Sequence, residues 1–270
     1  MNEQTITQQA VSEAADRLWE AARSGIATTP VRAVVGTEDL STAYAVQREL
    51  IDRALAGGDR LVGRKVGLTA PAVQAQLGVD QPDFGALLAS MEVDGPIARH
   101  RVLQPRVEAE IAFVIGRDVT EVPEDPADLI PYVARAVPAI EVVDSRVAGW
   151  DITITDTIAD NASSGLFALG TDEVRLDADV IREVEARMSV DGEVVSTGRG
   201  AACLGSPLAA LAWVARTMIG LGTPLRSGEV VLSGALGPMV DAEPGRRYVA
   251  SFNHDGRTSE VAVEFEEARP

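Results

Sequence analysis

The sequence predicts an α+β fold, in which N-terminal helices precede a rolled, mixed β-sheet. Three observations support this class. Apolar side chains recur at helical spacing in the first 57 residues, short strand-like runs dominate after Gly63, and turn signals separate those runs. We therefore expect an N-terminal helical region over residues 1–60 and a rolled β catalytic domain over residues 61–270.

Two helices are expected in the N-terminal region. Residues 6–23 carry apolar positions at helical spacing and end at a Ser-Gly pair, and a second helix is expected over residues 38–55, before a Gly-Gly pair. Neither segment contains a cluster of reactive side chains. We therefore expect this region to act as a scaffold or as a contact between subunits.

Strands and turns account for most of the remaining chain. An Asp-Gly pair at 191–192 predicts a two-residue hairpin turn, and a Ser-Pro pair at 206–207 predicts the start of a helix that ends near residue 221. Shorter helices are expected after Thr69 and after an Asp-Pro pair at 125–126. The expected strands cover residues 107–115, 139–143, 185–190, 193–196, 230–233, 248–253 and 259–265.

Composition and charge exclude several classes of function. A net charge of -17 would repel a phosphate polymer, so no nucleic acid partner is expected. We expect no membrane span and no signal peptide, because the polar start of the chain lacks an apolar core. The only cysteine, Cys203, permits no intrachain disulfide, which favours a cytoplasmic location. With only His100 and His254, a histidine-rich zinc site is not expected.

Glutamates on two predicted strands are candidate metal ligands. Glu108 and Glu110 alternate with apolar residues over 107–115, so they share one face of that strand, and Glu141 has similar apolar neighbours. Three half-buried carboxylates repel one another unless a cation neutralises them. Mg²⁺ or Mn²⁺, which prefer oxygen ligands, would do so. Alternatively, these glutamates line the wet face of an edge strand.

Three further segments contain candidate site residues. Lys65 is the only lysine among 24 basic residues and lies between glycines at 63 and 67, although composition bias alone could account for it. Asp83 follows an irregular Gly/Asp/Pro segment that is also typical of a plain turn. Ser163 belongs to a run of small hydroxyl and amide residues that suits carboxylate binding or an ordinary loop.

Together, these segments closely resemble the 2-keto-4-pentenoate hydratases of the fumarylacetoacetate hydrolase superfamily. The resemblance extends from about residue 30 to residue 265, and the motifs are specific as a set. The matching stretches are GRKVGLT (63–69), QLGVDQPDFG (76–85), QPRVEAEIAFV (104–114), PAIEVVDSR (138–146), DTIADNASSG (156–165), TGRGAACLG (197–205) and LSGALGPMV (232–240).

This resemblance implies a rolled, mixed β catalytic domain of the fumarylacetoacetate hydrolase type with helical segments beside it. It also implies a set of roles. The metal ligands would be Glu108, Glu110 and Glu141; the active-site lysine Lys65; the acid/base Asp83; and the substrate-binding residues Leu77, through its backbone, and Ser163.

The implied activity is metal-dependent addition of water to 2-hydroxypenta-2,4-dienoate, or a tail-substituted analogue, to give a 4-hydroxy-2-oxo acid in aromatic or steroid ring catabolism. Three alternatives remain: a 4-oxalocrotonate-type decarboxylase, a C–C bond hydrolase, and a non-catalytic partner subunit. The family also implies a homo-oligomer and possible association with a related decarboxylase. We expect Lys65 to act without covalent attachment, as a neutral amine in an apolar environment.

Overall fold

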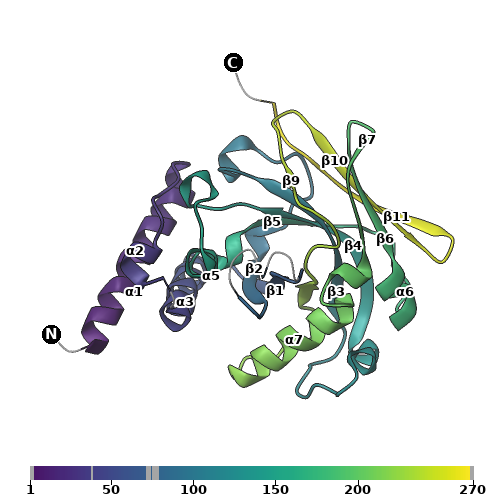
Figure 1. The fold of residues 1–270 in the computed structure, drawn as a ribbon, viewed down its shortest axis with the longest axis horizontal. Coiled ribbons are helices and arrows are strands. Elements are labelled where there is room, and N and C mark those ends of the chain that lie inside the picture. Colours follow the sequence, from purple (N-terminus) through teal and green to yellow (C-terminus); the bar gives the residue numbers. More distant parts are fainter. Residues whose placement is uncertain (1–2, 38, 71–73, 75–78, 268–270) are drawn as a thin grey trace.

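The computed structural model describes residues 3–37, 39–70, 74 and 79–267, and the expected α+β architecture is confirmed. Helices α1 to α3 lie together on one side of the molecule, and two β-sheets form the other side (Figure 1). Both predicted N-terminal helices are present. The helices of this region are α1 (Glu3–Ser24), α2 (Arg32–Val35) and α3 (Leu40–Ala56).

The larger sheet is mixed and contains seven strands among the described residues. Its order is β2-β1-β8-β3-β4-β5, and β9 also pairs with β3. The β1–β8 pairing is parallel and the other pairings are antiparallel. The strands are β1 (Leu61–Gly67), β2 (Asp83–Leu88), β3 (Arg106–Ile115), β4 (Val133–Val143), β5 (Ser164–Leu169), β8 (Val230–Leu232) and β9 (Val240–Asp241).

The smaller sheet is antiparallel, with the order β11-β10-β6-β7. The predicted hairpin turn is confirmed, because Asp191 and Gly192 both have positive φ angles, of 51° and 91°, as a type I′ turn requires. The strands are β6 (Glu185–Val190), β7 (Glu193–Arg199), β10 (Arg247–His254) and β11 (Arg257–Glu264).

The main apolar core lies between the two sheets. Ile111 and Phe113 of β3 are fully buried, as are Tyr248 and Phe252 of β10, and all four belong to one cluster. This places the apolar face of β3 against the smaller sheet, as its alternating pattern predicted. The other face of β3, which carries the two glutamates, is therefore directed away from the smaller sheet.

The remaining helices are short or cover the sheets: α5 (Ile154–Ala159), α6 (Ala178–Glu183) and α7 (Pro207–Gly220). Helix α7 confirms the predicted Ser-Pro start, because the Ser206 side chain accepts a hydrogen bond from the Leu208 amide. The helix expected after the Asp-Pro pair is a 3-10 helix, Pro126–Tyr132. Among the described residues, none of the helices is both long enough and apolar enough to cross a membrane.

A second apolar core joins the N-terminal helices to α5. Leu18 of α1, Val46 of α3 and Ile158 of α5 are buried in one cluster. Helix α3 begins at a capping residue, Asp39, whose carboxylate accepts a hydrogen bond from the Thr42 amide at 2.9 Å. The helical region is therefore packed directly against the segment that leads into β5.

Four of the described strands were not predicted: β1, β2, β5 and β9. Strand β1 was missed because it contains glycines, which are unfavourable in strands unless another backbone must approach closely. A methyl group at Gly63 would lie 1.9 Å from the Val230 carbonyl oxygen, so β1 can pair with β8 only if this residue is glycine. The helix expected after Thr69 falls mostly on residues 71–73 and 75–78, outside the described residues.

Candidate active site

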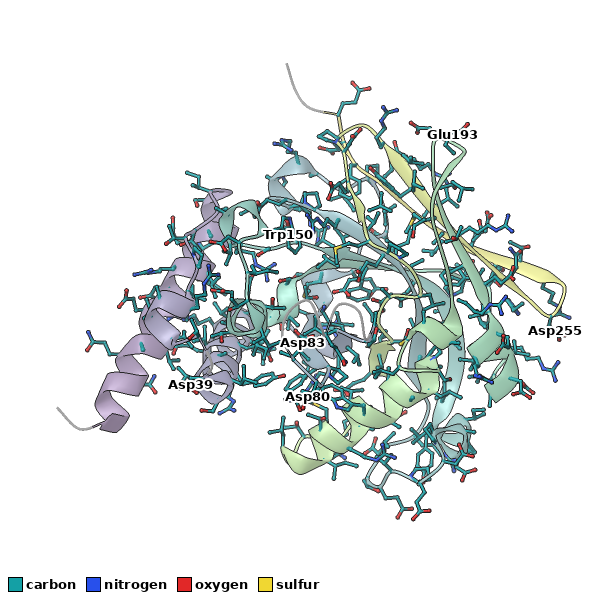
Figure 2. The ribbon with its side chains drawn as sticks, viewed as in Figure 1. Asp39, Asp80, Asp83, Trp150, Glu193 and Asp255 are labelled. Carbon is teal, nitrogen blue, oxygen red and sulfur yellow. The ribbon has the colours of Figure 1, made fainter. Side chains whose placement is uncertain are left out.

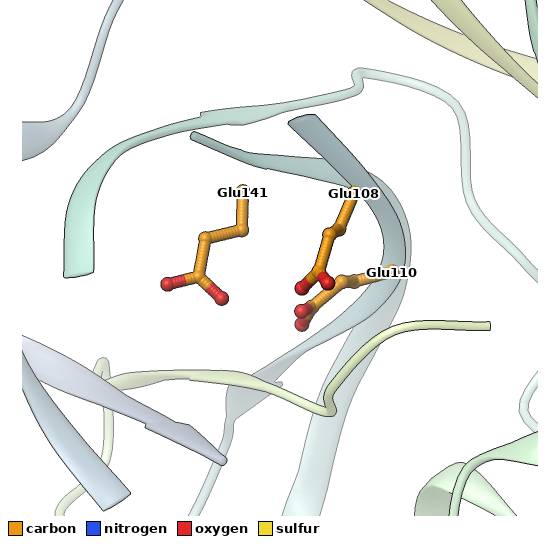
Figure 3. Close-up of side chains that lie close together, drawn as sticks. All are labelled: Glu108, Glu110 and Glu141. Atoms are coloured by element: carbon orange, nitrogen blue, oxygen red, sulfur yellow. The ribbon is translucent and has the colours of Figure 1, made fainter. Parts of the chain in front are cut away.

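Strands β3 and β4 bring the three predicted glutamates together. Glu108 lies opposite Glu141 in the strand register, and Glu110 is two residues further along β3 on the same face. Each offers a carboxylate oxygen, and these three atoms lie within 4.8 Å of one another (Figure 3). Glu110 and Glu141 are buried, and β3 lies inside the sheet between β8 and β4. The alternative of exposed glutamates on an edge strand is therefore wrong.

Burial and charge repulsion raise the pKa of the two glutamates on β3, Glu108 and Glu110. Burial, followed by the charge of Glu141, raises the pKa of Glu108 to about 7. The same causes raise the pKa of Glu110 well above its usual value, although the Gly234 amide donates a hydrogen bond to its Oε2 at 2.8 Å. These shifts indicate that the cluster is crowded with negative charge that the protein only partly compensates.

The cluster fits a hard divalent cation. Oε1 of Glu110 is buried and has no hydrogen-bond partner, and the Lys65 ammonium, 3.3 Å away, is the group that faces Oε1 of Glu141. Buried polar atoms normally have partners, so an unpartnered carboxylate oxygen in a cluster of three acids fits a bound cation. Three oxygen donors at this spacing match the preference of Mg²⁺ and Mn²⁺ for oxygen ligands.

Lys65 lies beside the glutamates, as the family resemblance implied. Its Nζ is 3.3 Å from Oε1 of Glu141, and both side chains are buried. Burial alone would lower the pKa of Lys65, but nearby carboxylates outweigh burial and raise it. The expectation of a neutral amine was therefore wrong for the metal-free chain. The carboxylates that raise the pKa are those of Glu141, Asp83, Glu108 and Glu110.

Asp83 is the second buried acid beside Lys65. It begins β2 opposite Gly67 of β1, lies in the interior of the molecule (Figure 2), and has two side-chain oxygens without partners. Burial is the main cause that raises its pKa to about 6. A methyl group at Gly67 would lie 2.2 Å from Oδ1 of Asp83 and 3.3 Å from Nζ of Lys65. The absence of a side chain at Gly67 therefore leaves room for both groups.

Ser163 lies in η5 (Asn161–Ser163), a short 3-10 helix between α5 and β5. Its hydroxyl is buried and has no hydrogen-bond partner. Its carbonyl accepts a hydrogen bond at 2.8 Å from the amide of Asp144, the residue after β4. The loop is thus tied to the strand that carries Glu141. The predicted Leu77 lies outside the described residues.

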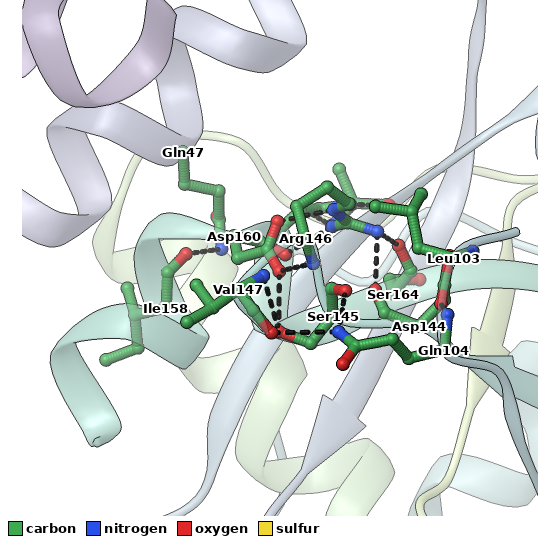
Figure 4. Close-up of polar contacts among 12 residues, drawn as sticks. Gln47, Leu103, Gln104, Asp144, Ser145, Arg146, Val147, Ile158, Asp160 and Ser164 are labelled. Atoms are coloured by element: carbon green, nitrogen blue, oxygen red, sulfur yellow. Dashed lines mark hydrogen bonds and ion pairs between the residues drawn. The ribbon is translucent and has the colours of Figure 1, made fainter. Parts of the chain in front are cut away.

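A network of hydrogen bonds and an ion pair holds this loop in place. Arg146 forms an ion pair with Asp160 and also donates to the Ser164 carbonyl at 2.8 Å (Figure 4). Asp144 accepts hydrogen bonds from the backbone amides of Leu103 and Gln104. The recognised stretches at 138–146 and 156–165 therefore meet in space and hold each other in place.

Sequence reasoning missed four residues that shape the site. Gly67 and Gly234 belong to the motifs that resemble the family. Gly67 lies two residues after Lys65, and Gly234 lies two residues after the end of β8; these positions were the signal that could have identified them. Asn161 was noted only as part of a polar loop. Gln47 had no signal, because it lies in a helix that showed no reactive cluster.

Comparisons with known proteins agree with the fold. A family model described as the C-terminal part of fumarylacetoacetate (FAA) hydrolase matches residues 64–264. The TodF product hydratase of Pseudomonas putida is 57% identical over 87% of this chain and 89% of its own length. A 2-keto-4-pentenoate hydratase of Burkholderia vietnamiensis is 53% identical over 90% of this chain and 94% of its own.

A solved relative extends the comparison to three dimensions. The 4-oxalocrotonate decarboxylase from Pseudomonas putida G7, complexed with magnesium and adipate, has a TM-score of 0.88. The two chains are 30% identical, and the match covers 96% of this chain and 97% of the decarboxylase chain.

The rolled sheet and the buried carboxylates define an α+β enzyme with a candidate divalent-cation site. The chain belongs to the fumarylacetoacetate hydrolase family, because the family model and the relatives cover most of its length.

The raised pKa of Glu108 predicts a pH-dependent penalty in metal-free protein. Because this pKa rises from 4.5 to about 7 on folding, stability is lost as the pH increases from 4.5 through about 7. Glu108→Gln should therefore raise the melting temperature of chelated protein at about pH 8, and the gain should shrink toward about pH 5. With Mg²⁺ present, the wild-type protein should be the more stable, because it keeps all three ligands.

Glu193→Gln provides the matched control, since Glu193 is exposed on β7, far from the cluster in sequence. It should leave the melting temperature unchanged with and without Mg²⁺. A chelated Glu108→Gln protein that is less stable than wild type at about pH 8 would contradict the repulsion argument.

Proposed function

We propose that this protein is a hydratase that adds water to 2-hydroxypenta-2,4-dienoate and forms 4-hydroxy-2-oxopentanoate. The observation that carries this proposal is a buried site, with Lys65 and Asp83 beside three clustered glutamates, in a chain 57% identical to the TodF product hydratase and 53% identical to a 2-keto-4-pentenoate hydratase. Such hydro-lyases act in the breakdown of aromatic rings, and we assign this protein to that process.

Glu108, Glu110 and Glu141 are the residues that would hold the cation, which we propose to be Mg²⁺ or Mn²⁺. Support comes from the unpartnered Oε1 of Glu110, from the close spacing of the three carboxylates and from the related decarboxylase, whose structure contains magnesium. When bound, the cation would supply Lewis-acid polarisation of the substrate's 2-oxygen and neutralise the repelling carboxylates.

Asp83 is assigned the proton transfers. The dienoate must first ketonise: it loses the proton of its 2-hydroxyl group and gains one at C5, which yields an α,β-unsaturated 2-oxo acid. Water then adds at C4, and a proton enters at C3. A general acid/base works best when its pKa lies near the operating pH, and the pKa of Asp83 is raised to about 6 by burial.

Lys65 is assigned a non-covalent role. Formation of an iminium would require a neutral amine, whereas the Lys65 ammonium is ion-paired with Glu141 at 3.3 Å. As a cation, it donates hydrogen bonds toward the oxygen where negative charge develops. Ser163, whose buried hydroxyl has no partner, is assigned to the substrate carboxylate, and Leu77 to a backbone contact with substrate.

Two other reactions have less support. The related decarboxylase shares the fold but only 30% of its sequence, well below the identity to the hydratases. A C–C bond hydrolase needs a histidine paired with a carboxylate to activate water. His254 lies in the smaller sheet and contacts Ser259, and His100 is exposed, so neither belongs to the glutamate cluster.

Turnover of a panel of freshly prepared dienoates tests the activity. With Mg²⁺ or Mn²⁺, 2-hydroxypenta-2,4-dienoate should lose its diene absorbance and yield 4-hydroxy-2-oxopentanoate, and a chelator should abolish turnover. Analogues with methyl or carboxylate tails will define the substrate range. Release of carbon dioxide from 2-oxo-3-hexenedioate, without hydration of any dienoate, would overturn the proposal.

Replacement of Lys65 by arginine tests its role. Lys65→Arg keeps the charge, but the larger, planar guanidinium cannot occupy the same buried position, so kcat should fall by roughly 10²–10⁴-fold. Arg64→Lys is the matched control, because Arg64 lies on the opposite face of β1, where its Nε contacts Met218. It should change kcat by less than about threefold.

Borohydride treatment in the presence of substrate, followed by mass spectrometry, completes this test. We expect no adduct on the wild-type protein. A trapped substrate-sized adduct on Lys65 would refute the non-covalent role, and near-wild-type turnover of Lys65→Arg would refute any catalytic role.

We also propose that the protein forms a homo-oligomer in the cytoplasm and can associate with a related decarboxylase. The free, buried thiol of Cys203 suits a reducing compartment. Light scattering at micromolar concentration should report a particle larger than the 28.5 kDa chain. A particle of monomer mass would reject the assembly.

A further inference from the structure

The loop that carries Ser163 has an unfavourable backbone conformation. Asn161, Ala162 and Ser163 have φ angles of 54°, 53° and 52°, in the left-handed region. Residues with a side chain seldom adopt this region, and a run of three persists only when the surroundings hold it in place. All three residues are buried.

The side chain of Asn161 supplies the main contact. Its Oδ1 accepts a hydrogen bond from the Ala86 amide at 2.8 Å, and its Nδ2 donates to the Ala86 carbonyl at 2.9 Å. β2 is the edge strand of the larger sheet, with β1 on its other side. The amide of Asn161 thus takes the place of a neighbouring strand for one residue of β2.

A glycine brings the same two segments into backbone contact. A methyl group at Gly85 would lie 2.6 Å from the Asn161 carbonyl oxygen. Any side chain there would push the loop away from β2. The separation of the loop and β2 is thus fixed in two ways, by the amide pair with Ala86 and by the missing side chain at Gly85.

The N-terminal region reinforces this arrangement. The buried side chain of Gln47 in α3 donates hydrogen bonds to the Phe84 carbonyl at 2.9 Å and to the Ile158 carbonyl at 3.1 Å. Figure 4 shows the second of these. In addition, the Tyr44 ring stacks on the Phe84 ring, with centroids 4.7 Å apart. Helix α3 therefore links the start of β2 to the helix that precedes the loop.

This junction separates two candidate substrate-contacting groups. Asp83 lies three residues before Ala86 on β2, and Ser163 lies two residues after Asn161. Both have buried side-chain oxygens without a protein partner. We propose that Asn161 is a positioning residue, which sets the position of Ser163 relative to Asp83 and thereby the affinity for a 2-oxo acid. This inference rests on the proposed function, which assigns both groups to one substrate.

A double-mutant cycle on ligand binding tests the inference without requiring turnover. The probe is 2-oxopentanoate, titrated by calorimetry into Mn²⁺-saturated protein. Asn161→Gly removes the amide but tolerates the left-handed backbone, so it isolates the loss of the hydrogen bonds. Asn161→Gly and Ser163→Ala should each weaken binding about tenfold.

The double variant decides between positioning and simple stabilisation. If Asn161 acts through Ser163, the double variant should also bind about tenfold more weakly than wild type, whereas independent effects would give about a hundredfold. Mn²⁺ affinity should stay within about threefold of wild type, because Asn161 is not among the clustered glutamates. Additive losses, or unchanged binding by Asn161→Gly, would overturn the inference.

Two further variants serve as a replacement for Asn161→Gly and as a control. Asn161→Asp keeps the acceptor for the Ala86 amide but lacks the donor to the Ala86 carbonyl. It takes the place of Asn161→Gly in the double-mutant cycle if that variant does not fold. Asn253→Asp is the matched control, because Asn253 accepts a hydrogen bond from Thr258 in the smaller sheet. Wild-type protein that binds 2-oxopentanoate but hydrates no dienoate would refute only the hydratase assignment. Wild-type protein that hydrates the dienoate but does not bind 2-oxopentanoate would overturn only this inference.

Discussion

Repulsion among three clustered carboxylates, two of them fully buried, is the constraint on which the rest of the structure depends. Adjacent strands hold Glu108, Glu110 and Glu141 within 4.8 Å of one another, in a setting that disfavours charge. The chain compensates only in part, through the Lys65 ammonium and the Gly234 amide. We propose that a divalent cation balances the remaining negative charge. A fold optimised for stability alone would have replaced these groups with apolar side chains.

The architecture holds the carboxylates and the groups that face them at fixed positions relative to one another. The smaller sheet covers the apolar face of β3, so the acidic face is free to form the site. Strand β8, which runs parallel to β1, leads directly to Gly234. The edge strand β2 presents Asp83 beside Lys65. The N-terminal helices contain none of the clustered acids, yet α3 reaches the start of β2 through Gln47. Their contribution to function is therefore geometric rather than chemical.

The sequence predicted those parts that depend on local periodicity. The alternation over residues 107–115 identified both the core face and the acidic face of β3, because the two-residue repeat is the same in the sequence and in the strand. The motif resemblance placed Lys65 and Asp83, which no local pattern could assign. The raised pKa of Lys65 in the metal-free chain was not predicted, because its sequence neighbours are glycine and apolar, while the charges that raise it come from other strands. Gln47 escaped prediction for the same reason, since its partners are 37 and 111 residues away.

The most direct test of this account is to locate a cation in the site. Crystals of the protein soaked with Mn²⁺, with diffraction data collected near the manganese absorption edge, would show its position by anomalous scattering. The account predicts a single strong peak between the carboxylates of Glu108, Glu110 and Glu141, lost in crystals of Glu110→Gln. A glutamate cluster without a peak in well-diffracting, Mn²⁺-soaked crystals, or a cation bound elsewhere in the chain, would contradict it.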